Sequence, residues 1–131
     1  MSETPDLLAG IEVMEAMTFR VGQMARSLRT DHADLMPCVR TVRASSHTSG
    51  TARLELDAAD PGAARALAAR LGIELEETIN RGVGTGGFEH LDGEVEINGV
   101  TVVVSGIRLI DETEWTVLQA EQLAAETAVS E

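Results

Sequence analysis

The stretch Glu94-Val-Glu-Ile-Asn-Gly-Val-Thr-Val-Val-Val-Ser-Gly106 decides the fold of this chain. Its Asn98-Gly99 pair separates two alternating runs, and Asn-Gly in that position is the strongest short-range indication of a β-hairpin with a two-residue turn. Such a turn gathers one apolar face, made of Val95, Ile97, Val100, Val102 and Val104. Val103 is the irregularity, because it is apolar on the face of Glu94 and Glu96. We therefore expect a hairpin inside a sheet, with its second strand covered on both sides.

A long helix is predicted before this hairpin, from about Pro5 to Arg29. Thr4-Pro5 resembles an N-cap followed by proline at the first helical position. Apolar residues recur along the helix at three- and four-residue steps, namely Leu7, Ile11, Met14, Met17, Val21, Met24 and Leu28. At ~1.5 Å per residue the helix would be roughly 37 Å long, more than short strands need for cover. The stripe therefore either packs on its own sheet or contacts, in part, a second copy or another protein.

The rest of the chain alternates between strand and helix patterns. A slip in the alternation between Val39 and Val42 indicates a β-bulge. Asp60 is placed to cap a short helix that Gly72 ends. The predicted elements are a strand at 38–46, a turn at 47–50, a strand at 51–58, a helix at 61–71, an edge strand at 73–79, the opening hairpin at 88–97 and 100–110, and a short helix within 112–128.

These elements predict one α+β domain over residues 1–131, with frayed ends at 1–3 and about 126–131. We expect two layers: a mostly antiparallel sheet of four or five strands in the order α-ββ-α-(β)ββ, and helices on one face. The predicted core is made of Leu7, Ile11, Met14, Val21, Leu54, Leu56, Leu67, Leu71, Val95, Ile97, Val100, Val102 and Val104.

The composition restricts the class of protein. The chain has 22 acidic residues against 10 basic ones, for a net charge of −12, which disfavours nucleic acid and anionic membranes as partners. Its single cysteine, Cys38, excludes an intramolecular disulfide framework. No signal peptide and no membrane-length apolar run are visible, so we expect a cytoplasmic protein. The absence of Lys and Tyr beside abundant Ala, Gly and Val suggests a bacterial, GC-rich gene.

One glycine-rich segment, Gly82-Val-Gly-Thr-Gly-Gly87, has the spacing G-x-G-x-x-G. The dinucleotide fingerprint requires a helix after the glycines, whereas a strand pattern rich in carboxylates follows here. A loop between strands is the favoured interpretation, with a backbone nest for an anion as the alternative. The residues that such a ligand loop would use are Arg81, Gly82, Gly84, Gly86, Gly87, His90 and His47.

No other pattern indicates chemistry. His32, Cys38, His47 and His90 lack the spacing of metal ligands or of a nucleophile and its base, so no metal, cofactor or catalytic residue is predicted. Arginines are concentrated between Arg20 and Arg53, but no nucleic-acid-binding module or interleaved aromatic residue accompanies them. Nucleic acid therefore remains an unfavoured partner.

Two functions remain open. The favoured one is a non-catalytic interaction module, an accessory or regulatory protein that forms a homodimer or binds a protein partner through the N-terminal helix or an open strand edge. Its interface candidates are Leu7, Ile11, Met14, Met17, Val21, Met24, Leu28 and Val103. The alternative is a domain, or an enzyme, that binds a small molecule or an anion at the Gly82–Gly87 loop.

Overall fold

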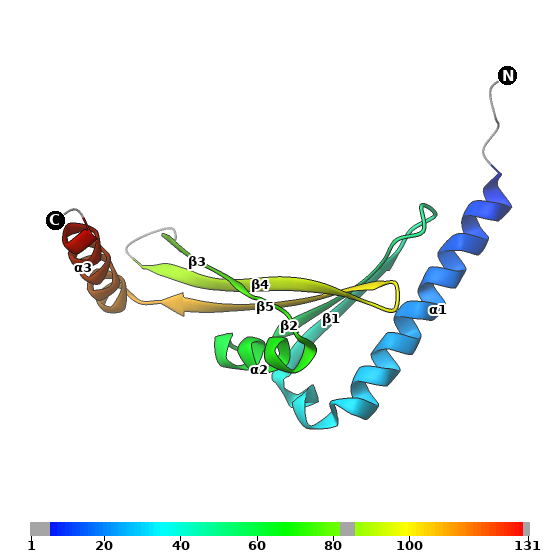
Figure 1. The fold of residues 1–131 in the computed structure, drawn as a ribbon, viewed down its shortest axis with the longest axis horizontal. Helices are drawn as coiled ribbons and strands as arrows, with labels where there is room; N and C mark the ends of the chain where they lie inside the picture. The colour runs from blue at the N-terminus through cyan, green and yellow to red at the C-terminus, as the bar shows by residue number, and fades with distance from the viewer. Residues whose placement is uncertain (1–5, 82–85, 130–131) are drawn as a thin grey trace, which may run out of the picture.

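The computed structural model describes residues 6–81 and 86–129 and confirms the α+β class (Figure 1). The long helix, the short helix and the five strands follow one another in the expected order. The elements are α1 (Leu7–Asp31), the 3₁₀ helix η1 (Ala33–Cys38), β1 (Val39–Ser46), β2 (Ala52–Ala58), α2 (Pro61–Leu71), β3 (Glu76–Arg81), β4 (Gly87–Ile97), β5 (Val100–Ile110) and α3 (Glu112–Val129).

Boundaries differ from the sequence-based expectation at both ends. Asp6 caps α1, because its carboxylate accepts hydrogen bonds from the backbone N–H groups of Leu8 and Ala9 at 3.0 and 3.1 Å. The predicted cap at Thr4-Pro5 lies outside the described residues. At the other end α3 continues to Val129, into the segment expected to fray.

The sheet has the strand order β1-β2-β5-β4-β3. All neighbouring strands are antiparallel except β2 and β5, which run parallel. The β4–β5 hairpin has the predicted register, with Ile97 opposite Val100, and its turn residues Asn98 and Gly99 have φ values of 50° and 81°. Positive φ at both positions is what a type I′ turn requires, so the local prediction is confirmed. The predicted bulge in β1 is also present, between Val39 and Thr41.

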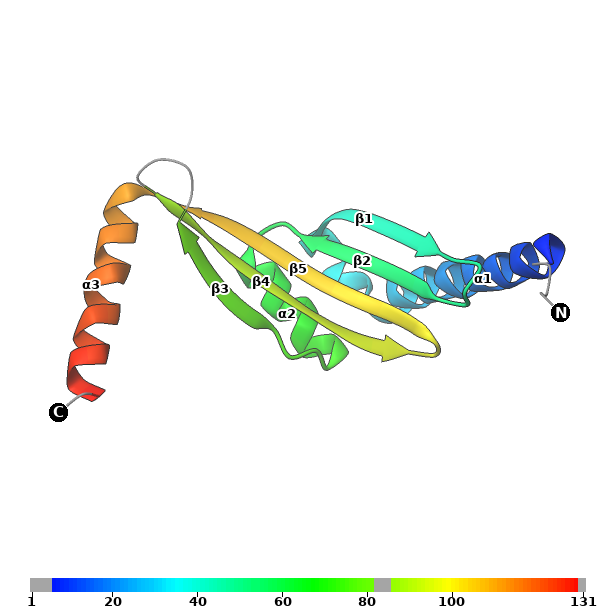
Figure 2. The ribbon, with the colours of Figure 1, turned by 90° about the horizontal axis from the view of Figure 1, so that it is seen from above.

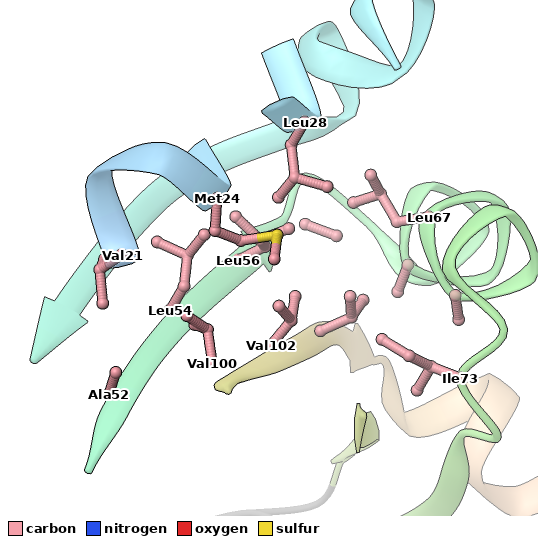
Figure 3. Packing of buried hydrophobic residues seen from close by; sticks show 14 of the residues in the cluster. Val21, Met24, Leu28, Ala52, Leu54, Leu56, Leu67, Ile73, Val100 and Val102 are labelled. Atoms are coloured by element: carbon pink, nitrogen blue, oxygen red, sulfur yellow. The ribbon is translucent and has the colours of Figure 1, made fainter. Parts of the chain in front are cut away.

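Both α1 and α2 lie on the same face of this sheet (Figures 1 and 2). Figure 3 shows Met24 of α1 pointing at Leu54 and Leu56 of β2. Val102 and Val104 of β5 are fully buried in the same cluster. Val103 points to the opposite face and is half-buried, and no helix of the described chain lies over that face (Figure 1). The long helix therefore does not supply the expected cover on the second face of β5, and cover by a partner chain stays a prediction.

The two halves of α1 differ in burial. Met17, Val21, Met24 and Leu28 are buried on the sheet, whereas the first turns of the helix run past the end of β1 and β2 (Figure 2). Leu7 is 81% exposed and Ile11 is 42% exposed, so their assignment to the core is wrong. The reason is geometric, because the sheet ends before the helix does.

The rest of the predicted core divides into two groups. Met14, Leu71, Val95 and Ile97 are half-buried, while Val21, Leu54, Leu56, Leu67, Val100, Val102 and Val104 are buried. Val95 and Ile97 keep partial exposure because β3 pairs with β4 only as far as Asp92, which leaves the last part of β4 at an edge.

Truncations on α1 test this division. Met24→Ala should lower the free energy of unfolding by about 2–4 kcal/mol, because it opens a cavity in the core. Leu7→Ala on the exposed turn should change it by less than about 0.5 kcal/mol. Urea denaturation followed by far-UV circular dichroism measures both, and equal losses for the two variants would contradict the division.

Candidate interaction surface

The outer side of α1 carries a set of residues that we call the outer stripe. They follow one another at alternating steps of four and three: Leu8, Glu12, Glu15, Phe19, Gly22, Arg26 and Arg29. All are exposed except Gly22, which is half-buried, and they lie on the side of the helix away from Met17, Val21, Met24 and Leu28. Leu8 is 74% exposed and Phe19 is 60% exposed. This surface was not among the sequence-based candidates, although its spacing could have been found in the sequence.

The charges of the outer stripe have no partners in the described chain. Outside α1, the arginines whose side chains the structure describes are paired; for example, Arg40 contacts Asp57 at 2.8 Å and Arg70 contacts Asp34 at 2.9 Å. No ion pair joins Glu12, Glu15, Arg26 or Arg29 to any described residue. The unpaired charges of α1 are thus available to a second molecule.

A buried carboxylate, Glu89 on β4, holds the opposite end of the molecule together. It is 7% exposed. Its two oxygens accept hydrogen bonds from Arg65 of α2 at 3.0 Å and from Arg108 of β5 at 2.9 Å, and Arg108 also contacts Glu114 of α3 at 2.7 Å. Burial raises the pKa of Glu89, but Arg108 and Arg65 outweigh it and leave the pKa below the ordinary value of 4.5. This network of two carboxylates and two arginines joins four elements, α2, β4, β5 and α3.

Trp115 fixes the start of α3 against β4. A Cβ on Gly87 would lie 2.7 Å from the Trp115 ring and 2.5 Å from the Asn80 carbonyl oxygen, so only glycine allows this approach. Gly86 is similarly confined by the carbonyl oxygen of Ile110. Between β3 and α3 lies a groove of about 620 Å³, lined by Glu77, Ile79, Trp115, Leu118, Gln119, Glu121 and Gln122.

The predicted ligand-loop residues are not gathered into one site. Gly82 and Gly84 lie outside the described residues, as does the side chain of Arg81, while Gly86 and Gly87 serve the close packing at the start of β4. His90 lies beside Asp92, with Nδ1 3.8 Å from the carboxylate. His47 lies in the β1–β2 turn at the other end of the sheet (Figure 1).

The interface candidates from the sequence also separate. Met17, Val21, Met24 and Leu28 are buried against their own sheet, whereas Leu7 and Ile11 are exposed and Met14 is half-buried. Among the described residues, no group of three or more His, Cys, Asp and Glu side chains is placed to hold a metal ion. Cys38 is free and packs at the edge of the core.

Comparisons with known proteins give no relative. No family model, no curated protein and no solved structure matches this chain. Within the described ranges, none of the helices has both the length and the apolar character needed to cross a membrane.

Replacing the buried carboxylate should weaken the whole far end of the molecule. Glu89→Gln removes the charge that two arginines share and should lower the free energy of unfolding by about 2 kcal/mol. The matched control is Glu77→Gln, since Glu77 contacts the same Arg65 only at 4.0 Å and is half exposed. Its loss should stay below about 0.5 kcal/mol. Urea denaturation at pH 7 compares the two, and a control as damaging as Glu89→Gln would contradict the assignment.

The free energy of unfolding should also fall in acid, because the ion pairs of Glu89 and Asp57 require ionised carboxylates. The pKa values of Glu89 and Asp57 are lowered in the folded state, the latter chiefly by the hydrogen bond from Arg40. A lowered pKa stabilises the fold fully above the ordinary values, 4.5 for Glu and 3.8 for Asp, and this contribution is lost as pH falls through the lowered values.

Denaturation midpoints measured between pH 7 and pH 3 should therefore drop below about pH 4.5. The drop should be smaller in Glu89→Gln, because that variant has already lost one of the titrating groups. Identical pH profiles for the variant and the wild type would rule out Glu89 as a contributor.

Proposed function

We propose that this protein is a non-catalytic interaction module that binds a second copy of itself or another protein through the exposed part of α1. The observation that carries the proposal is the projection of this helix beyond the sheet, with Leu7 81% and Leu8 74% exposed on its first turn. Clustered exposed apolar side chains on a small domain usually mark a contact with another molecule. A role as a bacterial, cytoplasmic accessory or regulatory protein agrees with the acidic, lysine-free composition.

The rigidity of the projecting segment supports the proposal. A helical segment of only a few turns, such as the projecting part of α1, would be marginally stable in water if it stood alone. Here Met17, Val21, Met24 and Leu28 anchor the second half of α1, so the exposed turns continue an already formed helix. The β1–β2 turn also touches the projecting part, because a Cβ on Gly10 would lie 3.5 Å from Thr48. A partner would therefore meet a preformed surface, which lowers the entropic cost of binding.

A pair of surface variants tests the proposal. Leu7→Gln/Leu8→Gln should weaken self-association, or capture of a protein from host extract, by at least about tenfold. The thermal midpoint of the variant should stay within about 2 °C of the wild-type value. The matched control is Ile107→Gln/Leu109→Gln, which replaces two exposed apolar residues at the other end of the sheet. Light scattering after gel filtration and quantitative capture supply the readouts. A strict monomer that captures nothing, or binding lost only in the control, would contradict the proposed function.

A further inference from the structure

The outer stripe has the periodicity of a helix-pairing seam. Alternating steps of four and three residues, from Leu8 to Arg29, keep these side chains on one side of the helix; four of the seven positions are charged and two, Leu8 and Phe19, are apolar. The sheet lies on the opposite side of α1, so a second helix can approach the stripe without meeting it (Figure 1). The seam is continuous over nearly the full length of α1.

Charge is divided along this seam. Glu12 and Glu15 occupy its first half, and Arg26 and Arg29 occupy its second half. Within one helix, like charges three residues apart destabilise each other. The helix dipole does not account for the two acids, because its effect is confined to the first turn, where α1 has no acidic residue. The helix dipole favours Arg29, which lies in the last turn, but Glu12, Glu15 and Arg26 are outside the terminal turns and have no ion pair within the described residues.

We propose that two copies of this chain pair through an antiparallel contact of their α1 helices along the outer stripe. This inference rests on the proposed function and names self-association as its form. In the antiparallel register, Glu12 of each copy faces Arg29 of the other, and Glu15 faces Arg26. A parallel arrangement would set glutamate against glutamate and arginine against arginine, so the charges select the orientation.

The same register satisfies the shape of the seam. Phe19 of each copy falls opposite Gly22 of the other, where the absence of a side chain leaves room for a phenyl ring. In the single chain Arg26 bends back over this glycine, with Nη1 3.5 Å from the position of a Cβ. Turning Arg26 outward toward Glu15 of the second copy would uncover Gly22. The contact is isologous, so it closes on itself as a two-fold dimer.

The seam predicts a dimer that depends on salt. Its apolar part is small, with Phe19 at the centre and Leu8 near the ends, and its four cross-pairs are exposed. Such pairs are screened when the Debye length falls from about 10 Å at 0.1 M salt to about 3 Å at 1 M. The dissociation constant should therefore rise with salt by at least about tenfold over this range.

Charge exchange tests the pairing. Glu12→Arg/Glu15→Arg and Arg26→Glu/Arg29→Glu each turn four attractive pairs into repulsive ones and should raise the dimer dissociation constant by about 30-fold or more. Combining all four substitutions restores every opposite-charge pair and should return the constant to within about threefold of the wild type. Sedimentation equilibrium gives the constants, and circular dichroism checks that each variant is folded.

A cross-link tests the direction. In a Cys38→Ser background, a mixture of Glu15→Cys and Arg26→Cys chains should form a disulfide-linked heterodimer under mild oxidation. Neither variant alone should do so, because equivalent positions of an antiparallel pair lie about 16 Å apart, beyond the reach of a disulfide. Links between identical variants would instead support a parallel pairing and overturn the inference.

Two outcomes separate this inference from the proposed function. A wild-type dimer that is insensitive to the charge variants but lost in Leu7→Gln/Leu8→Gln would overturn the seam and leave the interaction module standing. A wild-type chain that remains monomeric at millimolar concentration, yet captures another protein through Leu7 and Leu8, would also overturn the seam and leave the interaction module standing. Restoration by the fourfold variant, together with the heterodimeric cross-link, would support the seam.

Discussion

The parallel contact between β2 and β5 is the interaction on which the rest of the structure depends. It places Leu54 beside Val102 and Leu56 beside Val104, and all four side chains point to the helix-covered face and are buried. Without this contact the β1–β2 hairpin would be an isolated two-stranded ribbon, which is marginally stable at best in water, beside a separate three-stranded β3–β4–β5 sheet. Both α1 and α2 pack on the surface that the two units form together.

The sequence predicts features that depend on neighbouring residues in the chain, and it misses contacts between segments that are distant in the chain. The β4–β5 hairpin follows from Asn98 and Gly99, because their backbone preferences act within the turn itself. No local sequence pattern predicts the pairing of β2 with β5. Similarly, Leu7 and Ile11 continue the periodicity of Met17 and Val21, so only the length of the sheet decides which of them is buried. Pattern sets the face of a helix, and tertiary structure sets how much of that face is covered.

The candidate sites show the same limit. Glu89 lies in the carboxylate-rich strand that follows the glycines, and nothing in its local pattern marks it as buried. Its burial depends on Arg65 and Arg108, which come from other elements and neutralise it. Gly86 and Gly87 resemble part of a ligand loop, yet close backbone and tryptophan contacts explain them. The outer stripe was present in the sequence but resembled an ordinary solvated face. It became distinct when the structure showed which charges elsewhere were already paired.

The placement of α3 has a consequence for assembly. Trp115 and the Arg108–Glu114 contact hold this helix at the end of the sheet opposite the projecting part of α1 (Figure 1). A two-fold particle joined at α1 would therefore carry two α3 helices at its far extremities. A ligand that met both ends at once would bind by avidity, with an effective concentration set by the rigid span between them. The distance between the two α3 helices would then select partners whose binding sites have a matching spacing.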